Sequence, residues 1–241
     1  MFWTKSFIYN PITKGVVELV LLKRMFLIIF GVAGVIGTVI TLLVHNTTEP
    51  AVKSVEFPCC TGQYGIVIQA VDRYCGPYVE DGSDEIVSDV ASAVVYNSGE
   101  FILDAFVINL NTNTKTYRFE ATMLLPGMRV SVLDINRSVW HGESIMDYSC
   151  TARISQYQIQ PLSAIELYPI SGDEILLVNK YVLPVCNVSI FHKAWDESSG
   201  TYLGGVTYKT YIKNFRTGDR LVIKPIKYNR DQCKIIWMEC G

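Results

Sequence analysis

The sequence of 241 residues lacks the short motifs that mark the common classes of enzyme. It contains no G-x-S-x-G, no H-E-x-x-H, no P-loop and no glycine pattern typical of dinucleotide binding. Only three histidines are present, and they lie far apart along the chain. We therefore expect no cofactor, no metal and no catalytic residue, and the sequence predicts a non-catalytic protein.

The chain also lacks an excess of basic residues, with 21 Lys and Arg against 23 Asp and Glu. Up to residue 45 there are four basic residues and one acidic residue, which leaves 17 basic and 22 acidic residues for the rest. A face that binds nucleic acid needs a concentrated basic patch. Nucleic acid is therefore not expected as a partner.

One long hydrophobic run is present, at residues 25–44, with twenty residues and no charge. This length matches a helix that crosses a bilayer. A cleaved signal peptide, which has a shorter apolar region and small residues at its cleavage site, and a buried soluble helix are the alternatives. Lys23 and Arg24 directly before the run place the N-terminus in the cytoplasm. We predict a cytoplasmic tail (1–24), a signal anchor in the plasma membrane (25–44), a linker (45–54) and an extracytoplasmic remainder.

After Pro50 the sequence lacks any long stretch of helical period. Short runs rich in Val, Ile, Tyr, Thr and Phe alternate with turn-forming clusters such as "NSGE", "LPGM", "ISGD" and "RTGD". This pattern is typical of an all-β fold, and the length allows two sandwiches of roughly 100 residues each. The prediction is two tandem immunoglobulin-like β-sandwich domains, at residues 55–148 and 149–241.

Two blocks of sequence repeat in the same order. "AVVYNSGEFILDAFVINL" is matched by "ILLVNKYVLPVCNVSIFH", which aligns Asn97 with Asn179. "LLPGMRVSVLDIN" is matched by "FRTGDRLVIKPIKYN", which aligns Gly127 with Gly218. Pro126-Gly127 fits the centre of a type II turn, and Val130 then begins an alternating strand. The repeated block is therefore interpreted as a scaffold corner, with both glycines at φ > 0.

These motifs resemble bacterial surface immunoglobulin-like repeats of the adhesion type, and the membrane-anchored β-sandwich proteins of Gram-positive bacteria. The resemblance covers residues 84–136 well and residues 172–229 more loosely; the second copy has Thr217-Gly218 in place of Pro-Gly. It implies a fold and a location at the cell surface, and it transfers no active site. The function it implies is binding, or holding an assembly at the envelope; the alternatives are a cell-wall-modifying cysteine enzyme and a purely structural envelope subunit.

All the cysteines follow the predicted span, which favours structural disulfides in an extracytoplasmic protein. Two or three bridges are expected, with buried free thiols or a metal site as alternatives. Because the number is odd, one thiol stays free or pairs between chains. A local bridge from Cys75 to Cys59 or Cys60 is favoured by their spacing. The seven disulfide candidates are Cys59, Cys60, Cys75, Cys150, Cys186, Cys233 and Cys240.

Two weaker hypotheses concern chemistry. An enzyme would use Cys150 as nucleophile, His141 as base and Arg153 as oxyanion partner. The segment 80–85, "EDGSDE", groups four carboxylates that could bind Ca²⁺, although the ligand order of an EF-hand is absent and a solvated acidic loop is favoured.

The binding candidates come from a difference between the two copies. Asn97 and Gly127 are 30 positions apart, whereas Asn179 and Gly218 are 39 apart, so "HKAWDESSGTYLGG" is interpreted as an inserted loop. It brings together Trp195, Asp196 and Tyr202, which would contact a protein or glycan partner. The alternative is a long hairpin folded onto its own domain, with Trp195 buried.

Overall fold

The computed structural model describes residues 54–156, 165–180 and 185–240. The predicted tail, the predicted span at residues 25–44 and nearly all of the linker lie outside these residues. Within them, strands and turns make up the whole fold, as the sequence predicts. None of the described segments forms a helix with the length and hydropathy needed to span a bilayer.

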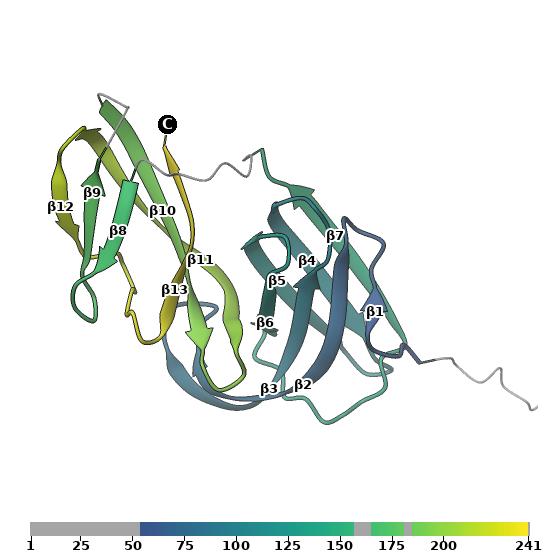
Figure 1. Cartoon of the computed structure of the whole chain (residues 1–241). Coiled ribbons are helices and arrows are strands. Elements are labelled where there is room, and N and C mark those ends of the chain that lie inside the picture. Colours follow the sequence, from purple (N-terminus) through teal and green to yellow (C-terminus); the bar gives the residue numbers. More distant parts are fainter. Residues whose placement is uncertain (1–53, 157–164, 181–184, 241) are drawn as a thin grey trace, which may run out of the picture. The chain divides into compact units, whose positions relative to one another are not determined.

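The first set of strands forms two antiparallel layers (Figure 1). In one layer β3 lies between β2 and β6, with the short β1 outside β2; in the other, β4 lies between β5 and β7. The strands are β1 (Cys59–Cys60), β2 (Ile66–Tyr78), β3 (Glu85–Asn97), β4 (Leu103–Asn111), β5 (Thr116–Leu124), β6 (Arg129–Leu133) and β7 (Asp147–Ile154).

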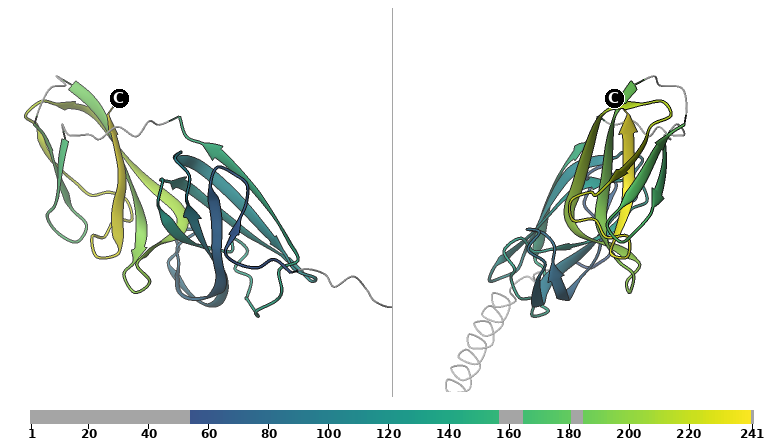
Figure 2. Two further views of the ribbon diagram at one scale, coloured as in Figure 1. Left: turned by 45° about the vertical axis from the view of Figure 1, so that its right-hand side comes forward. Right: turned by 90° about the vertical axis from the view of Figure 1, so that its left-hand side faces the viewer.

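The second set repeats this arrangement (Figure 2). Here β9 lies between β8 and β12, and β10 lies between β11 and β13, again with every neighbour antiparallel. The strands are β8 (Ile165–Pro169), β9 (Ile175–Asn179), β10 (Val185–Asp196), β11 (Thr201–Arg216), β12 (Arg220–Ile223) and β13 (Cys233–Cys240). Six strands in the same order and pairing, β2–β7 and β8–β13, therefore occur twice.

Each pair of layers encloses its own apolar core, because alternate residues of each strand point inward. In the first core Val95 from β3 packs against residues such as Phe106 and Phe119 from the opposite layer. In the second, Leu177 from β9 packs with Val188 and Ile190 from β10. The alternation predicted after Pro126-Gly127 is present, since Val130 and Val132 are both fully buried.

The predicted corners are equivalent in the structure. Gly127 N–H donates to the Asn97 carbonyl at 2.8 Å, and Gly218 N–H donates to the Asn179 carbonyl at 2.7 Å. Both glycines have positive φ, +74° and +85°. The Asn97 side-chain amide donates to the Leu124 carbonyl, and Asn179 donates to Phe215 in the same way. These buried asparagines fix the turn that leads into β6 and β12.

The two sets of strands belong to one compact unit. Strands β11 and β6 pair in parallel, with Tyr202 opposite Val130. This pairing joins one layer of the first set to one layer of the second set in a seven-stranded sheet. A close approach of β11 to β5 accompanies this pairing. Thr122 donates to the Gly205 carbonyl at 3.2 Å, and a Cβ at Gly205 would lie 1.7 Å from the carbonyl oxygen of Glu120. Only glycine fits at this contact.

The nine extra residues of the second copy do not form an inserted loop. They lengthen the hairpin β10–β11, in which Trp195 lies directly opposite Tyr202. Part of the extra length is a bulge in β11. His192 pairs with Tyr208 and Ala194 pairs with Leu203, so the four residues 204–207 of β11 lie opposite the single residue Lys193 of β10. A further departure concerns β7, which pairs with β4 and so extends the first set of strands past residue 148.

The structure does not contain the predicted disulfides: all seven cysteines are free. The local bridge from Cys75 is wrong for a geometric reason. Cys59 and Cys60 lie opposite Ile68 and Val67 at the beginning of β2, whereas Cys75 lies near its end. At about 3.3 Å per residue the separation is roughly 23 Å, far beyond the limit of about 7 Å between bridged Cα atoms.

Candidate functional site

The hairpin β10–β11 ends in the aromatic pair predicted from the sequence. The rings of Trp195 and Tyr202 meet edge to face, with centroids 5.0 Å apart. The Lys234 ammonium from β13 lies 3.0 Å from the centroid of the Trp195 ring and covers one face of it. Both aromatic residues are partly buried, so the hairpin packs on its own fold while neither residue is fully enclosed.

Trp195 also lines a hollow of the surface, which we call the hairpin groove. It has a volume of about 600 Å³ and lies between the end of hairpin β2–β3 and the end of hairpin β10–β11. Its lining residues are Tyr74, Cys75, Pro77, Val79, Asp84, Ile86, Ala194, Trp195, Asp196, Ser198, Leu203, Tyr208, Lys227, Gln232 and Cys233. The sequence identified only the Trp195 side of this groove.

The floor of the groove is held by a small apolar cluster that joins the two hairpins. Tyr78, Val90, Leu133 and Leu203 are buried together there. The Tyr78 hydroxyl donates to the Asp134 carbonyl at 3.0 Å, which ties β2 to the turn after β6. Because neither hairpin can bury these side chains alone, the position of each groove wall depends on the other.

The charged groups of the groove have partners within the protein. Lys227 pairs with Asp84 at 2.7 Å, and Asp196 accepts hydrogen bonds from the backbone and hydroxyl of Ser198 at 3.0 and 2.6 Å. The Tyr74 hydroxyl donates to the Pro77 carbonyl at 3.0 Å, and burial raises the pKa of Tyr74 to about 12. Asp196 therefore holds the hairpin turn. What the groove offers to a partner is mainly aromatic and aliphatic surface.

One wall carries a strongly exposed aliphatic side chain. Ile86, at the beginning of β3, is 73% exposed. Single exposed apolar residues are common on protein surfaces. Here, however, Ile86 borders a concave surface that also contains Pro77 and Val79. This combination of a hollow and an apolar rim is typical of a protein-binding site.

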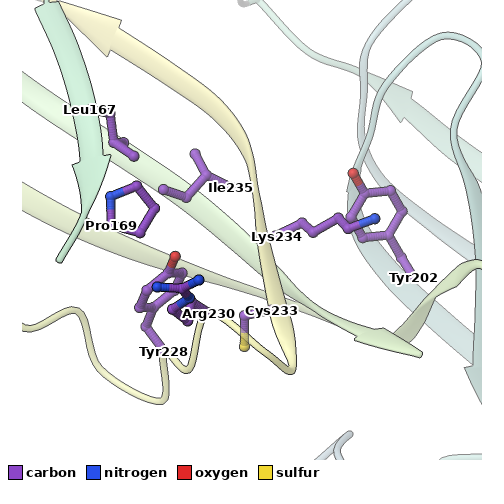
Figure 3. A pocket seen from close by; sticks show the side chains of 8 residues that line it. All are labelled: Leu167, Pro169, Tyr202, Tyr228, Arg230, Cys233, Lys234 and Ile235. Atoms are coloured by element: carbon purple, nitrogen blue, oxygen red, sulfur yellow. The ribbon is translucent and has the colours of Figure 1, made fainter. Parts of the chain in front are cut away.

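A second hollow of about 500 Å³ lies at the open side of the second core (Figure 3). Leu167 and Pro169 from β8 line one side, and Ile235 from β13 lines the other. Lys234 extends from β13 toward Tyr202. This hollow is shallow and open, and the Cys233 thiol in its lining is buried, with its pKa raised by burial.

A buried lysine and a carboxylate hold the bulge of β11. Lys193 is fully buried, and its ammonium donates to the Gly205 and Val206 carbonyls at 2.8 and 3.2 Å. Glu80 accepts from the backbone of Gly205 and Leu133, both at 2.7 Å. Burial lowers the pKa of Lys193 to about 7 and raises that of Glu80. The pair replaces the sheet hydrogen bonds that the bulge interrupts, so its role is structural.

The acidic segment at residues 80–85 does not gather its carboxylates around a cation. Asp81 and Glu85 both pair with Arg137, at 2.5 and 2.6 Å, and hydrogen bonds from Ser83 and Arg137 lower the pKa of Asp81 to about 2. Asp84 points to Lys227 instead. No metal-binding cluster is found among the described residues. In this arrangement the carboxylates have separate partners, as the solvated acidic loop favoured by the sequence would allow.

The residues of the enzyme hypothesis are not assembled into a site. Cys150 packs against the first core, and burial raises the pKa of its thiol, the opposite of what a nucleophile needs. Arg153 is three positions away on the same strand, which puts it on the other face, where it pairs with Asp104 at 2.5 Å. The backbone N–H of His141 donates to Glu143 in an exposed turn.

The wall of the groove contributed by β2 and β3 is not predicted from the sequence. Tyr74, Cys75 and Ile86 come from the first set of strands, more than 100 positions before Trp195. Only the fold brings the two hairpins together, and no short-range pattern signals it. A comparison with protein-family models, curated proteins and solved structures finds no match to this chain.

Proposed function

We propose that this protein is a membrane-anchored, non-catalytic binding or assembly protein whose two tandem immunoglobulin-like sandwiches lie outside the cytoplasm. The anchor is the apolar segment at residues 25–44, and location at the cell surface follows from its orientation. The repeated strand order and the paired corners at Gly127 and Gly218 support the two-domain interpretation. The binding site is the hairpin groove.

The observation that carries the proposal is the composition of this groove. It is a hollow of about 600 Å³ whose charged groups already have partners: Asp84 pairs with Lys227, and Asp196 accepts hydrogen bonds from Ser198. A glycan would need free donors and acceptors, and a ring face open for stacking. Lys234 covers one face of Trp195. An apolar side chain of a protein partner fits such a surface better, so a protein is the partner we propose.

The test is affinity capture with the full-length protein in detergent, using the membrane fraction of the host. Ile86→Asp places a charge on the apolar rim without disturbing the core, because Ile86 is 73% exposed. We expect this variant to lose a partner that the unchanged protein captures, and to keep its melting temperature. Undiminished capture by Ile86→Asp would reject the groove as the binding site.

Ile170→Asp is the matched control. Ile170 is also exposed, at 50%, but it follows β8 and does not line the groove. It introduces the same charge on the same kind of residue, so general effects of surface charge should appear equally in both variants. Retained capture by Ile170→Asp and lost capture by Ile86→Asp would assign the interaction to the groove.

A further inference from the structure

Two cysteines far apart in sequence are in contact at one end of the second sandwich. The thiol of Cys240 donates to the sulfur of Cys186, with 3.3 Å between the Sγ atoms. Cys186 lies near the beginning of β10 and Cys240 is the last residue of β13. The two strands are antiparallel neighbours, with Cys240 opposite Val188. Strand pairing therefore brings the two thiols together.

We propose that Cys186 and Cys240 form a disulfide when the protein meets a small-molecule or protein disulfide, and that this bond fixes β13 to β10. The thiolate of Cys240 attacks one sulfur of the oxidant, forms a mixed disulfide and releases one thiol. Cys186 then attacks the Cys240 sulfur, forms the internal bond and releases the second thiol. The two cysteines lose two electrons and two protons, and the oxidant is reduced to two thiols.

The surroundings permit the closure. A disulfide has its sulfurs about 2.0 Å apart, so the two atoms must approach by roughly 1 Å. In the described part of the sheet β13 is an edge strand, with β10 as its neighbour. The last residue of an edge strand moves at low cost, because few hydrogen bonds hold it. Cys186 is buried and its thiol points to the Phe215 carbonyl at 3.6 Å, so it is held in place while Cys240 moves.

The order of the steps also follows from the structure. Cys240 is only partly buried, whereas Cys186 is 5% exposed, so an external oxidant reaches Cys240 first. Burial, and secondly the neighbouring Cys186, raise the pKa of the Cys240 thiol. Because the thiolate is the attacking species, exchange should be slow at neutral pH and faster at alkaline pH.

Peptide mapping of the full-length protein in detergent tests the proposal, with oxidised glutathione as the probe. After oxidation, blocking of free thiols and digestion with trypsin, residues 181–193 and 235–241 should be recovered as one linked species that separates on reduction. Both peptides recovered unlinked, each carrying the blocking group or glutathione, would overturn the proposal. So would a bridge from Cys240 to any other cysteine.

Thermal unfolding gives a second readout with a matched control. Oxidation should raise the melting temperature of the unchanged protein and of Cys233→Ser, because Cys233 lies at the opposite end of β13, roughly 23 Å from Cys240. Cys240→Ser should show no rise. A rise that persists in Cys240→Ser, or that disappears in Cys233→Ser, would contradict the assignment of the bond to Cys186 and Cys240.

Discussion

The two corner glycines provide a quantitative test of the repeated scaffold. Gly127 and Gly218 have φ of +74° and +85°, and a Cβ built on either would meet no heavy atom within 4 Å. Substitution therefore costs backbone strain and no steric clash. An L-residue in the left-handed region loses about 1–2 kcal/mol, and a β-branched residue lies at the upper end. We expect Gly127→Val and Gly218→Val each to lower the free energy of unfolding by about 1–2 kcal/mol.

The assay is urea or thermal unfolding of the full-length protein in detergent. For a protein of this size, 1 kcal/mol corresponds to a shift of about 2–4 °C in the melting temperature. Gly172→Ala is the matched control, since Gly172 has equally open surroundings but no φ in the left-handed region. It should be neutral, or stabilising by about 0.4–1 kcal/mol through the unfolded state. Losses that differ widely between Gly127 and Gly218, or an equal loss at Gly172, would refute the equivalence of the two corners.

Three further predictions follow from the groove and its supports. Between about pH 7 and 8 stability should rise by up to about 1.4 kcal/mol per pH unit, because the unfolded chain keeps a proton that Lys193 has lost; at higher pH the buried thiols, whose pKa values are raised, oppose this rise. Lys193→Met should remove the rise, and a flat profile between about pH 7 and 8 in the unchanged protein would contradict it. In timed alkylation of the native protein, the exposed Cys75 should react well before Cys150, because burial raises the pKa of the Cys150 thiol. Faster reaction of Cys150 would support the hypothesis that it is a nucleophile. Joint replacement of Trp195 and Tyr202 by Ala should lower the melting temperature measurably, because the rings pack on each other; an unchanged value would show that they are free surface residues.

Local patterns in the sequence predict the scaffold well. Alternating apolar residues predict the strands, and Gly127 and Gly218 predict the corners, because a turn with positive φ leaves a clear residue preference. The corner asparagines Asn97 and Asn179 are found by alignment of the two copies alone. Their buried hydrogen bonds then explain why this residue type recurs.

The parts that depend on contacts between distant segments are not predictable in this way. The extra length of the second copy suggests a loop, but the residues extend a hairpin because Trp195 and Tyr202 pair across it. Lys193 looks like a surface residue in "FHKAW", yet it is fully buried because the bulge opposite it leaves carbonyls without partners. Likewise, the cysteine spacing favours a local bridge and carries no information about the length of β2.

We propose above that the hairpin groove binds a protein partner outside the cytoplasm. Photo-cross-linking in intact cells tests it most directly, with a photoreactive amino acid placed at Ile86 in one variant and at Ile170 in another. We expect a discrete cross-linked protein from position 86, formed with an externally accessible partner, and none from position 170. Cross-linking from position 170 alone, or equal products from both positions, would contradict it.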